Sequence, residues 1–347
     1  MLDTINPTLV QLRAQVKRKE MSSTKPAACW SGKDLLMGKP IPSLTIILRT
    51  IGCRFAQHGG CTMCGYINDA ARVPPTEEEL IAQFNFALTK APDSDFIVKI
   101  FTSGSFFDTT EVPYNVQDYI FGCLEQNKHV KKVLVETRPM FVNDQDGKNL
   151  EHAKVHFNKP LEIAIGLETA NDTIRSFCIN KVFSLNEFKK ACIIANNKNI
   201  TVKAYLLLKP PFLSEGDAIR DVISSAKVAA EYAQTISINP CNIQKGTLVE
   251  RLYHRREYRP PYLWSIIEVL KTAKRENPQT IIVSDPVAAG TRRGPYNCPK
   301  CNREAAQLIS DFSLTQDTEL FEKFECECRY LWEKVVQLED YAYGAQL

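Results

Sequence analysis

The chain has 347 residues, of which 44% are hydrophobic, and a net charge of +3. This is enough apolar material for one large domain with an appendage, and the charge is too small to indicate nucleic-acid binding by itself. The first thirty residues do not form a signal peptide, and no apolar run approaches the ~18 residues of a membrane helix, so the sequence predicts a cytoplasmic protein without a membrane partner.

Six short apolar runs rich in β-branched residues predict strands that are covered on both faces. They cover residues 43–50, 95–102, 131–137, 161–168, 201–208 and 235–240. Helices are predicted between them at 76–90, 114–127, 184–198 and 214–232. Thr76 with Glu79, and Ser184 with Glu187, have the spacing of a capping box at a helix start. Strands that alternate with helices predict a parallel sheet with right-handed crossovers.

The predicted fold is therefore α/β, a partial (β/α)6 barrel of TIM type. We expect an N-terminal extension over 1–42, the barrel over 43–245 and a C-terminal extension over 246–347. Ligands of such sheets bind at the carboxyl ends of the strands. The segments with candidate functional residues follow the carboxyl ends of the predicted strands. They are a cysteine-rich loop after the first strand and residues 102–108, 136–141, 166–172 and 209–212 after the next four.

The loop after the first predicted strand contains Cys53, Cys61 and Cys64. Three thiols at close spacing suit an iron–sulfur cluster with one iron left open to a small molecule. Glycine lets a backbone wrap closely around such a cluster, and the loop has four, Gly52, Gly59, Gly60 and Gly65. The alternative is a zinc site completed by His58. Cysteine–histidine nucleophilic catalysis would not explain three thiols.

The three cysteines, with Tyr66 shortly after them and a βα barrel, resemble the radical S-adenosylmethionine (SAM) superfamily. The usual spacing there is three residues and then two, so the seven-residue first gap departs from the common pattern and is similar to the branch of the Elongator catalytic subunit. Ordered fragments over about residues 43–301 resemble RaSEA, the radical SAM family of archaeosine biosynthesis: CRFAQHGGCTMCGY, FTSGSFFD, ETRPMFV, GLETANDTIR, LLLKPPF, NPCNIQKGTLVERL, YRPPYLWSIIEVL and RGPYNCPKC.

The resemblance implies a radical SAM barrel in which the three cysteines hold a 4Fe–4S cluster and SAM binds the open iron. It places Tyr66 near the adenine, and the SAM amino group at a strand end formed by Ser103, Gly104 and Ser105. A simple turn is the alternative for this last segment.

Two acidic residues, Glu136 and Glu168, end otherwise apolar strands. They are expected to accept hydrogen bonds from the SAM ribose or to form buried ion pairs with Arg138 or Arg175. Arg175 is alternatively a partner for the SAM carboxylate, because a guanidinium presents planar donors.

The resemblance also implies a reaction. A partner transferase, the archaeosine synthase ArcS, attaches lysine to a cyano-deazaguanine base of tRNA. A radical SAM carbon–nitrogen lyase then cleaves the bond between the nitrogen and carbon of the lysine side chain to leave archaeosine. An electron donor is required, whose identity the sequence does not give. The alternatives are a radical SAM enzyme for another RNA base or a small metabolite, and a non-catalytic metal-containing RNA-binding module.

A basic and aromatic segment at 250–264 is a predicted tRNA contact, because guanidinium groups neutralise phosphates and aromatic rings stack on unpaired bases. Its arginines are Arg251, Arg255, Arg256 and Arg259. The alternative is a solvated helix start whose aromatic residues pack inward. Asn239, Asn242 and Gln244, after the sixth strand, either read polar edges of a substrate or close turns.

A second cysteine group near the C-terminus consists of Cys298, Cys301, Cys326 and Cys328. Four thiols in two close pairs predict a closed structural metal site, most simply zinc, that fastens the extension to the barrel. The alternative is a second iron–sulfur cluster. The single residue between the last two cysteines is less usual for zinc than a gap of two residues.

Overall fold

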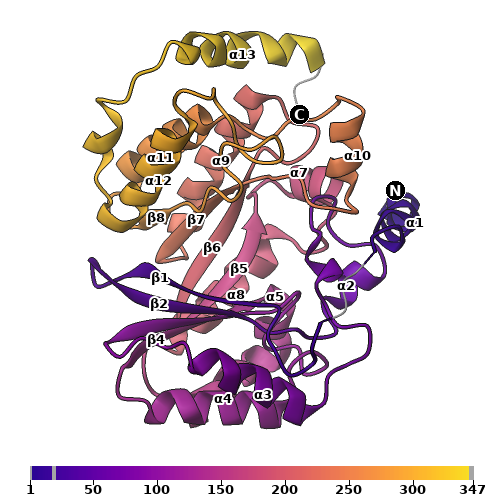
Figure 1. Cartoon of the computed structure of the whole chain (residues 1–347), viewed down its shortest axis with the longest axis vertical. Helices are drawn as coiled ribbons and strands as arrows, with labels where there is room; N and C mark the ends of the chain where they lie inside the picture. The colour runs from indigo at the N-terminus through magenta and orange to yellow at the C-terminus, as the bar shows by residue number, and fades with distance from the viewer. Residues whose placement is uncertain (1, 18–20, 344–347) are drawn as a thin grey trace.

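The computed structural model describes residues 2–17 and 21–343. Its centre is one eight-stranded sheet in which the strands follow each other in sequence order (Figure 1). β1 (Ala28–Leu36) pairs antiparallel with β2, and every later pair of neighbours is parallel. The parallel strands are β2 (Lys39–Ile47), β3 (Phe96–Phe101), β4 (Val130–Thr137), β5 (Leu161–Glu168), β6 (Thr201–Leu208), β7 (Thr235–Pro240) and β8 (Ile281–Val283).

The predicted α/β class and half-barrel sheet are confirmed, and the six predicted strands correspond to β2 through β7. The sheet also takes in β1 and β8 at its two edges, from segments that the prediction leaves outside the barrel. Neither carries a long apolar run, since the middle of β1 is exposed and β8 is apolar over only three residues. The predicted domain boundaries stay a prediction.

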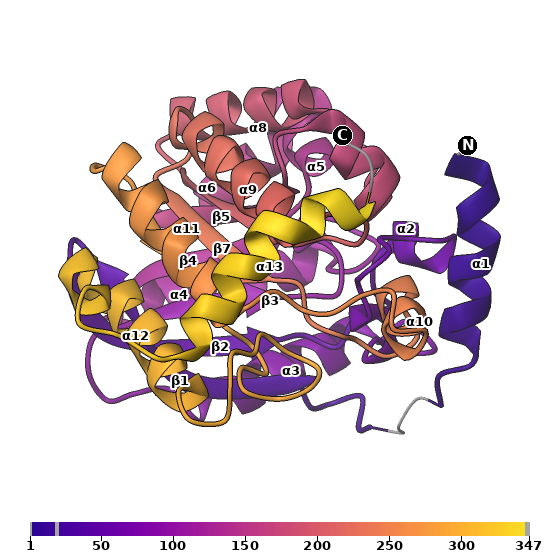
Figure 2. The same cartoon turned by 90° about the horizontal axis from the view of Figure 1, so that it is seen from above.

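Most of the helices cover the outside of the sheet, and the others lie at the ends of the strands (Figures 1 and 2). In the first half of the protein they are α1 (Leu2–Ala14), α2 (Arg54–Gln57), α3 (Glu77–Leu88), α4 (Tyr114–Gln126), α5 (Pro139–Asn143), α6 (Lys148–His156) and α7 (Asp172–Ile174). In the second half they are α8 (Leu185–Asn197), α9 (Glu215–Ala230), α10 (Leu248–His254), α11 (Leu263–Glu276), α12 (Asn302–Thr315) and α13 (Cys328–Tyr343). The predicted helices are α3, α4, α8 and α9, and both capping boxes are present at the starts of α3 and α8.

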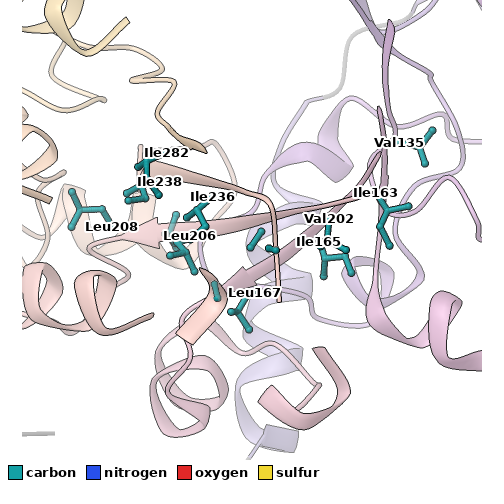
Figure 3. Close-up of a cluster of buried hydrophobic side chains, with 14 of the residues drawn as sticks. Val135, Ile163, Ile165, Leu167, Val202, Leu206, Leu208, Ile236, Ile238 and Ile282 are labelled. Carbon is teal, nitrogen blue, oxygen red and sulfur yellow. The ribbon is translucent and has the colours of Figure 1, made fainter. Parts of the chain in front are cut away.

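Alternate residues of the central strands form the core (Figure 3). Ile163, Ile165 and Leu167 of β5 are fully buried, and so are Ile236 and Ile238 of β7. Because successive side chains of a strand point to opposite faces of the sheet, every second side chain packs against the helices. The other face is polar at the base of the barrel, where Lys132 pairs with Glu162 at 3.0 Å and Lys99 pairs with Asp34. Ile97 and Leu134 are also buried on this inner face, so it mixes apolar and charged side chains.

Two terminal elements lie over the barrel. α1 lies beside α2 and α10 in both views (Figures 1 and 2), and α13 crosses the outside near α9 and α11. Within the part of the protein described, no helix combines the length and apolar content needed to cross a membrane.

Candidate active site at the carboxyl ends of the strands

The three-cysteine loop begins just after β2, and Cys53 caps the N-terminus of the short helix α2. Cys53, Cys61 and Cys64 are each half-buried and unpaired. Burial raises the pKa of Cys61 to about 12, and the neighbouring Cys64 and Cys53 act in the same direction, whereas Lys181 opposes them. The loop therefore brings the three thiols near one another, as predicted, and a bound metal would have to displace their protons.

The spacing of these thiols indicates what they can hold. Among the described residues, two groups of metal-ligating side chains are compact, and within each group all ligand atoms lie within 4.8 Å of one another. The Sγ atoms of Cys53, Cys61 and Cys64 do not meet this limit, so this trio is more widely spread. Such spacing suits ligands of a multi-iron cluster better than ligands of one tetrahedral ion. His58, the proposed fourth zinc ligand, is exposed, and its Nδ1 lies 3.0 Å from the Arg54 carbonyl oxygen. The chemistry of the donor set therefore fits an iron–sulfur cluster.

The loop after β3 approaches the cysteine loop closely. A Cβ on Gly104 would lie 2.8 Å from Cys53 Cα and would collide with the Glu111 carboxylate, so a side chain has no room there. Ser103 Oγ donates to the Tyr66 carbonyl oxygen at 3.2 Å. Ser105 is fully buried, and its Oγ lies 2.9 Å from Thr137 Oγ1, so this hydroxyl stabilises the loop from inside.

A buried carboxylate that the sequence prediction missed holds these two loops together. Glu111 accepts from Thr50 Oγ1 at 2.7 Å and from the Ser105 amide at 2.9 Å, which joins the end of the β2 segment to the β3 loop. Burial raises the pKa of Glu111 to about 7. No motif marks Glu111, because its partners lie in a separate loop and on the backbone.

Glu111 leads to a prediction on pH. Burial also raises the pKa of Glu136 to about 7, whereas a glutamate in the unfolded state titrates near 4.5. Between these values the folded protein binds more protons than the unfolded state, so the free energy of unfolding should fall as pH rises through this window. Denaturation of the cluster-free protein across the window should show a shallower fall for Glu111→Gln than for wild type. The exposed control Glu276→Gln should keep the wild-type slope, and equal slopes in all three proteins would contradict the assignment.

The ends of β4 and β5 contribute the two predicted acidic residues. Glu136 is hydrogen-bonded to Tyr205, and Glu168 pairs with Lys181 at 2.6 Å. Lys181 Nζ also donates to the Gly166 carbonyl oxygen at 2.6 Å, and Glu168 has a left-handed φ of +67°. The ion-pair partner of Glu168 is thus Lys181 instead of either predicted arginine.

The two arginines at these strand ends have different environments. Arg138 Nη1 lies 3.9 Å from Cys53 Sγ, and its guanidinium stacks 5.5 Å from the centre of the Phe55 ring. Arg175 is fully buried and donates to the carbonyl oxygens of Thr169 and Phe183 at 2.6 and 2.7 Å. Arg175 Nη2 also forms an ion pair with Asp172, and a contact between Arg175 and the SAM carboxylate stays a prediction.

The loop after β7 closes one side of the site. Gln244 Oε1 accepts from the Gly65 amide at 2.6 Å, and Gln244 Nε2 donates to Asn242 Oδ1 at 3.2 Å. Asn239 Oδ1 accepts from Ser237 Oγ at 3.2 Å. Tyr66, next to Gly65, is 54% exposed, and its contact with the adenine stays a prediction. These hydrogen bonds are of the kind that the turn-closing alternative describes, and Gln244 also positions the cysteine loop. Recognition of polar substrate edges by the three amides stays a prediction.

The basic segment divides into an exposed and a buried part. Arg251, Arg255 and Arg256 are exposed on α10 and just after it. Arg259 instead pairs with Glu215 at 2.7 Å and with Glu339 at 3.2 Å. Two of its aromatic residues are buried, Tyr258 and Trp264. The inward-packing alternative therefore describes this buried part, whereas the three exposed arginines stay a predicted RNA contact.

The C-terminal cysteines form a compact group, as predicted. Cys298 Sγ lies 3.5 Å from Cys301 Sγ and 3.6 Å from Cys326 Sγ, and Cys301 Sγ lies 3.5 Å from Cys328 Sγ. Four thiolates about 2.3 Å from one ion would be about 3.8 Å apart, so this spacing matches a single tetrahedral metal. Trp264 Nε1 donates to Cys328 Sγ at 3.3 Å, which links the group to α11.

Known proteins are similar along most or nearly all of the sequence. Archaeosine synthase subunit beta of Methanosarcina acetivorans is 46% identical over 99% of both proteins. An uncharacterized protein of Methanocaldococcus jannaschii is 41% identical, over 93% of this protein and 90% of that one. Archaeosine synthase subunit beta of Thermococcus kodakarensis is 43% identical, over 89% of this protein and 96% of that one.

Among solved structures, the Methanocaldococcus infernus Elp3 with an N-terminal deletion has a TM-score of 0.48 and 15% identity, with 78% of this protein and 63% of that one covered. No family model matches the sequence. The full-length relatives at 43% and 46% identity show that the protein belongs to the archaeosine synthase subunit beta family.

Proposed function

We propose that the protein is a radical SAM enzyme whose 4Fe–4S cluster is held by Cys53, Cys61 and Cys64. The observation that carries this proposal is a loop that brings three thiols together at the carboxyl ends of parallel strands, where α/β proteins bind their ligands. The cluster and SAM, when bound, supply a 5′-deoxyadenosyl radical that abstracts a hydrogen atom from the substrate.

The protein's own residues would position these groups. Arg138 and Lys181 place positive charge beside the three thiols, which would offset the negative charge of a thiolate-bound cluster. Ser103 and Gly104 bring the end of β3 against the cysteine loop, where hydroxyl and carbonyl oxygens can accept from the SAM ammonium group. The half-exposed ring of Tyr66 offers an apolar surface for the adenine.

We further propose that the substrate is tRNA carrying the lysine adduct of cyano-deazaguanine that ArcS makes. The enzyme would act as a carbon–nitrogen lyase on the lysine side chain and leave archaeosine. Support comes from relatives named archaeosine synthase subunit beta, at 43% and 46% identity. Exposed Arg251, Arg255 and Arg256 would contact tRNA phosphates, and the salt dependence of binding would measure their charge contribution.

An anaerobic assay tests this function. Reconstituted protein, a chemical reductant and SAM should form 5′-deoxyadenosine and archaeosine when lysine-modified tRNA is added. A brown protein that cleaves SAM and leaves this tRNA unchanged would contradict the substrate and favour a different radical SAM reaction. A colourless protein with about two zinc ions would favour a non-catalytic RNA-binding module.

For the second cysteine group we propose a structural zinc ion, because the Sγ spacing of 3.5–3.6 Å fits one metal. Metal analysis should find one zinc per protein molecule. Cys301→Ala should lose that zinc and unfold at a lower temperature, since Cys301 also precedes α12 at its N-terminus. Iron in the other site should remain. Full zinc retention in Cys301→Ala, or iron at this position in wild type, would contradict the assignment.

A further inference from the structure

An arginine from the N-terminal helix lies at the centre of the cysteine loop. Arg13 Nη2 donates to the carbonyl oxygens of Cys61 at 2.9 Å and Cys64 at 3.2 Å, and Nη1 donates to that of Ala56 at 3.5 Å. Arg13 is only 5% exposed. One guanidinium thus holds the backbone of two of the three cysteines from outside the predicted barrel.

The loop is shaped to receive this helix. Gly60 has a φ of +83°, and a Cβ there would lie 2.9 Å from Arg13 Nη2 and 2.8 Å from Ala56 Cα. Gly59 has a φ of +144°, and a Cβ there would overlap the side chain of Asn6 on α1. Asn180 Nδ2 donates to Asn6 Oδ1 and to the Gly60 carbonyl oxygen, both at 2.9 Å. Glycine at these two positions therefore permits the approach of α1.

A second loop of the site also receives α1. Gly246, which follows Gln244 after β7, has a φ of +69°, and a Cβ there would collide with Val16 and lie 3.4 Å from Arg13 Cα. Figures 1 and 2 show α1 beside α2 and α10, which flank these two loops. The helix therefore joins the loop after β2 to the loop after β7 at the mouth of the barrel.

The charge of Arg13 has no carboxylate beside it among the described residues. Its acidic neighbours are Cys64, Cys61 and Cys53. Its Nε is buried without a hydrogen-bond partner. A buried cation without a counter-ion is costly, so this arrangement calls for negative charge on the cysteine loop. A cluster bound by three thiolates would provide that charge, and reduction of the cluster would increase it.

We propose that Arg13 is a positioning residue that clamps the cysteine loop in its ligating shape and favours the reduced state of the cluster. This inference rests on the proposed function, because it needs a cluster on Cys53, Cys61 and Cys64. The clamp acts through the Cys61 and Cys64 carbonyls, and the electrostatic effect acts through the proximity of a buried positive charge.

The test compares Arg13→Met, Arg13→Lys and the control Arg275→Met, which removes the same group from an exposed position on α11. After anaerobic reconstitution, the rate of iron loss to a chelator and the midpoint potential of the cluster are measured, the latter by spectroscopic redox titration. Arg13→Met should lose iron about tenfold faster than wild type, and its potential should be more negative. Arg13→Lys should keep a potential nearer to wild type and still lose iron faster, because an ammonium group cannot reproduce the guanidinium fork. Arg275→Met should match wild type.

The outcomes separate the two proposals. Wild-type protein that takes up no iron would overturn the proposed function and this inference with it. Wild-type protein with a cluster, together with an Arg13→Met variant of unchanged potential and unchanged iron loss, would overturn the inference alone. Faster iron loss with an unchanged potential would overturn the electrostatic role of Arg13.

Discussion

Cys61→Ala should abolish iron binding and SAM cleavage and leave the metal at the second cysteine group in place. Two thiolates cannot replace three around a cluster, and the loss of groups that merely support a metal ligand already reduces affinity by about 10–100-fold. We therefore expect cluster retention and formation of 5′-deoxyadenosine to fall by more than about 100-fold. Iron and zinc analysis with a SAM-cleavage assay measures both effects.

The matched control for this variant is Cys123→Ala. Cys123 is also a half-buried free thiol, and it lies on α4, outside both cysteine groups. It should retain the iron, the second metal and the SAM cleavage of wild type. An equal loss of iron in both variants would show a general effect of thiol removal, and retention of iron by Cys61→Ala would contradict the assignment of the cluster.

Glu215→Ala should lower the free energy of unfolding by about 3–5 kcal/mol, because it removes the buried carboxylate beside the buried Lys209 ammonium and leaves only Glu339, at 3.6 Å, to offset that charge. Glu215 is 1% exposed and accepts from Lys209 Nζ at 2.9 Å, Arg259 Nη1 at 2.7 Å and Ser265 Oγ at 2.5 Å. The Tyr262 amide also donates to it, at 2.9 Å. This network joins the start of α9 to the segment before α11. Urea denaturation should show the loss, and the exposed control Glu276→Ala should stay near wild type.

The same network predicts a dependence on pH in the acid range. Although burial opposes ionisation, the charges of Lys209 and Arg259 lower the pKa of Glu215 below its ordinary value near 4.5. The stability that Glu215 contributes is therefore fully present above pH 4.5 and is lost as pH falls through the lower, folded-state pKa. In wild type the free energy of unfolding should drop in that acid window, and Glu215→Ala should show a smaller drop. Identical acid profiles would contradict this role.

The sequence predicts the parallel sheet well, because long apolar runs in β2 through β7 reflect burial directly. It does not predict β8, whose three residues are placed by pairing with Thr235–Ser237 of β7. It also predicts two helix starts to the residue, since Thr76 and Ser184 satisfy the first turn through local contacts. Helix starts can thus be predicted from the spacing of residues in the sequence, whereas strand pairing at the edges of the sheet cannot.

The candidate site shows the same division. The three cysteines are visible as a group because they are neighbours in the sequence, but the residues that organise them are not. Arg13, Glu111 and Lys181 come from other segments than the cysteine loop, and each binds at least one backbone group of the site. Arg259 lies in a basic and aromatic segment of the kind that contacts RNA, but it forms an ion pair with Glu215. The partner of Arg259 is distant in the sequence, so a linear motif cannot predict this ion pair.

The most direct test of the proposed chemistry uses tRNA whose lysine adduct carries deuterium along the lysine side chain. If a radical formed in this protein cleaves the carbon–nitrogen bond of the lysine, deuterium should appear in 5′-deoxyadenosine while the labelled adduct is converted to archaeosine. Cys61→Ala should give neither product. Archaeosine formed with no deuterium in 5′-deoxyadenosine, or 5′-deoxyadenosine formed while the adduct remains intact, would contradict the account.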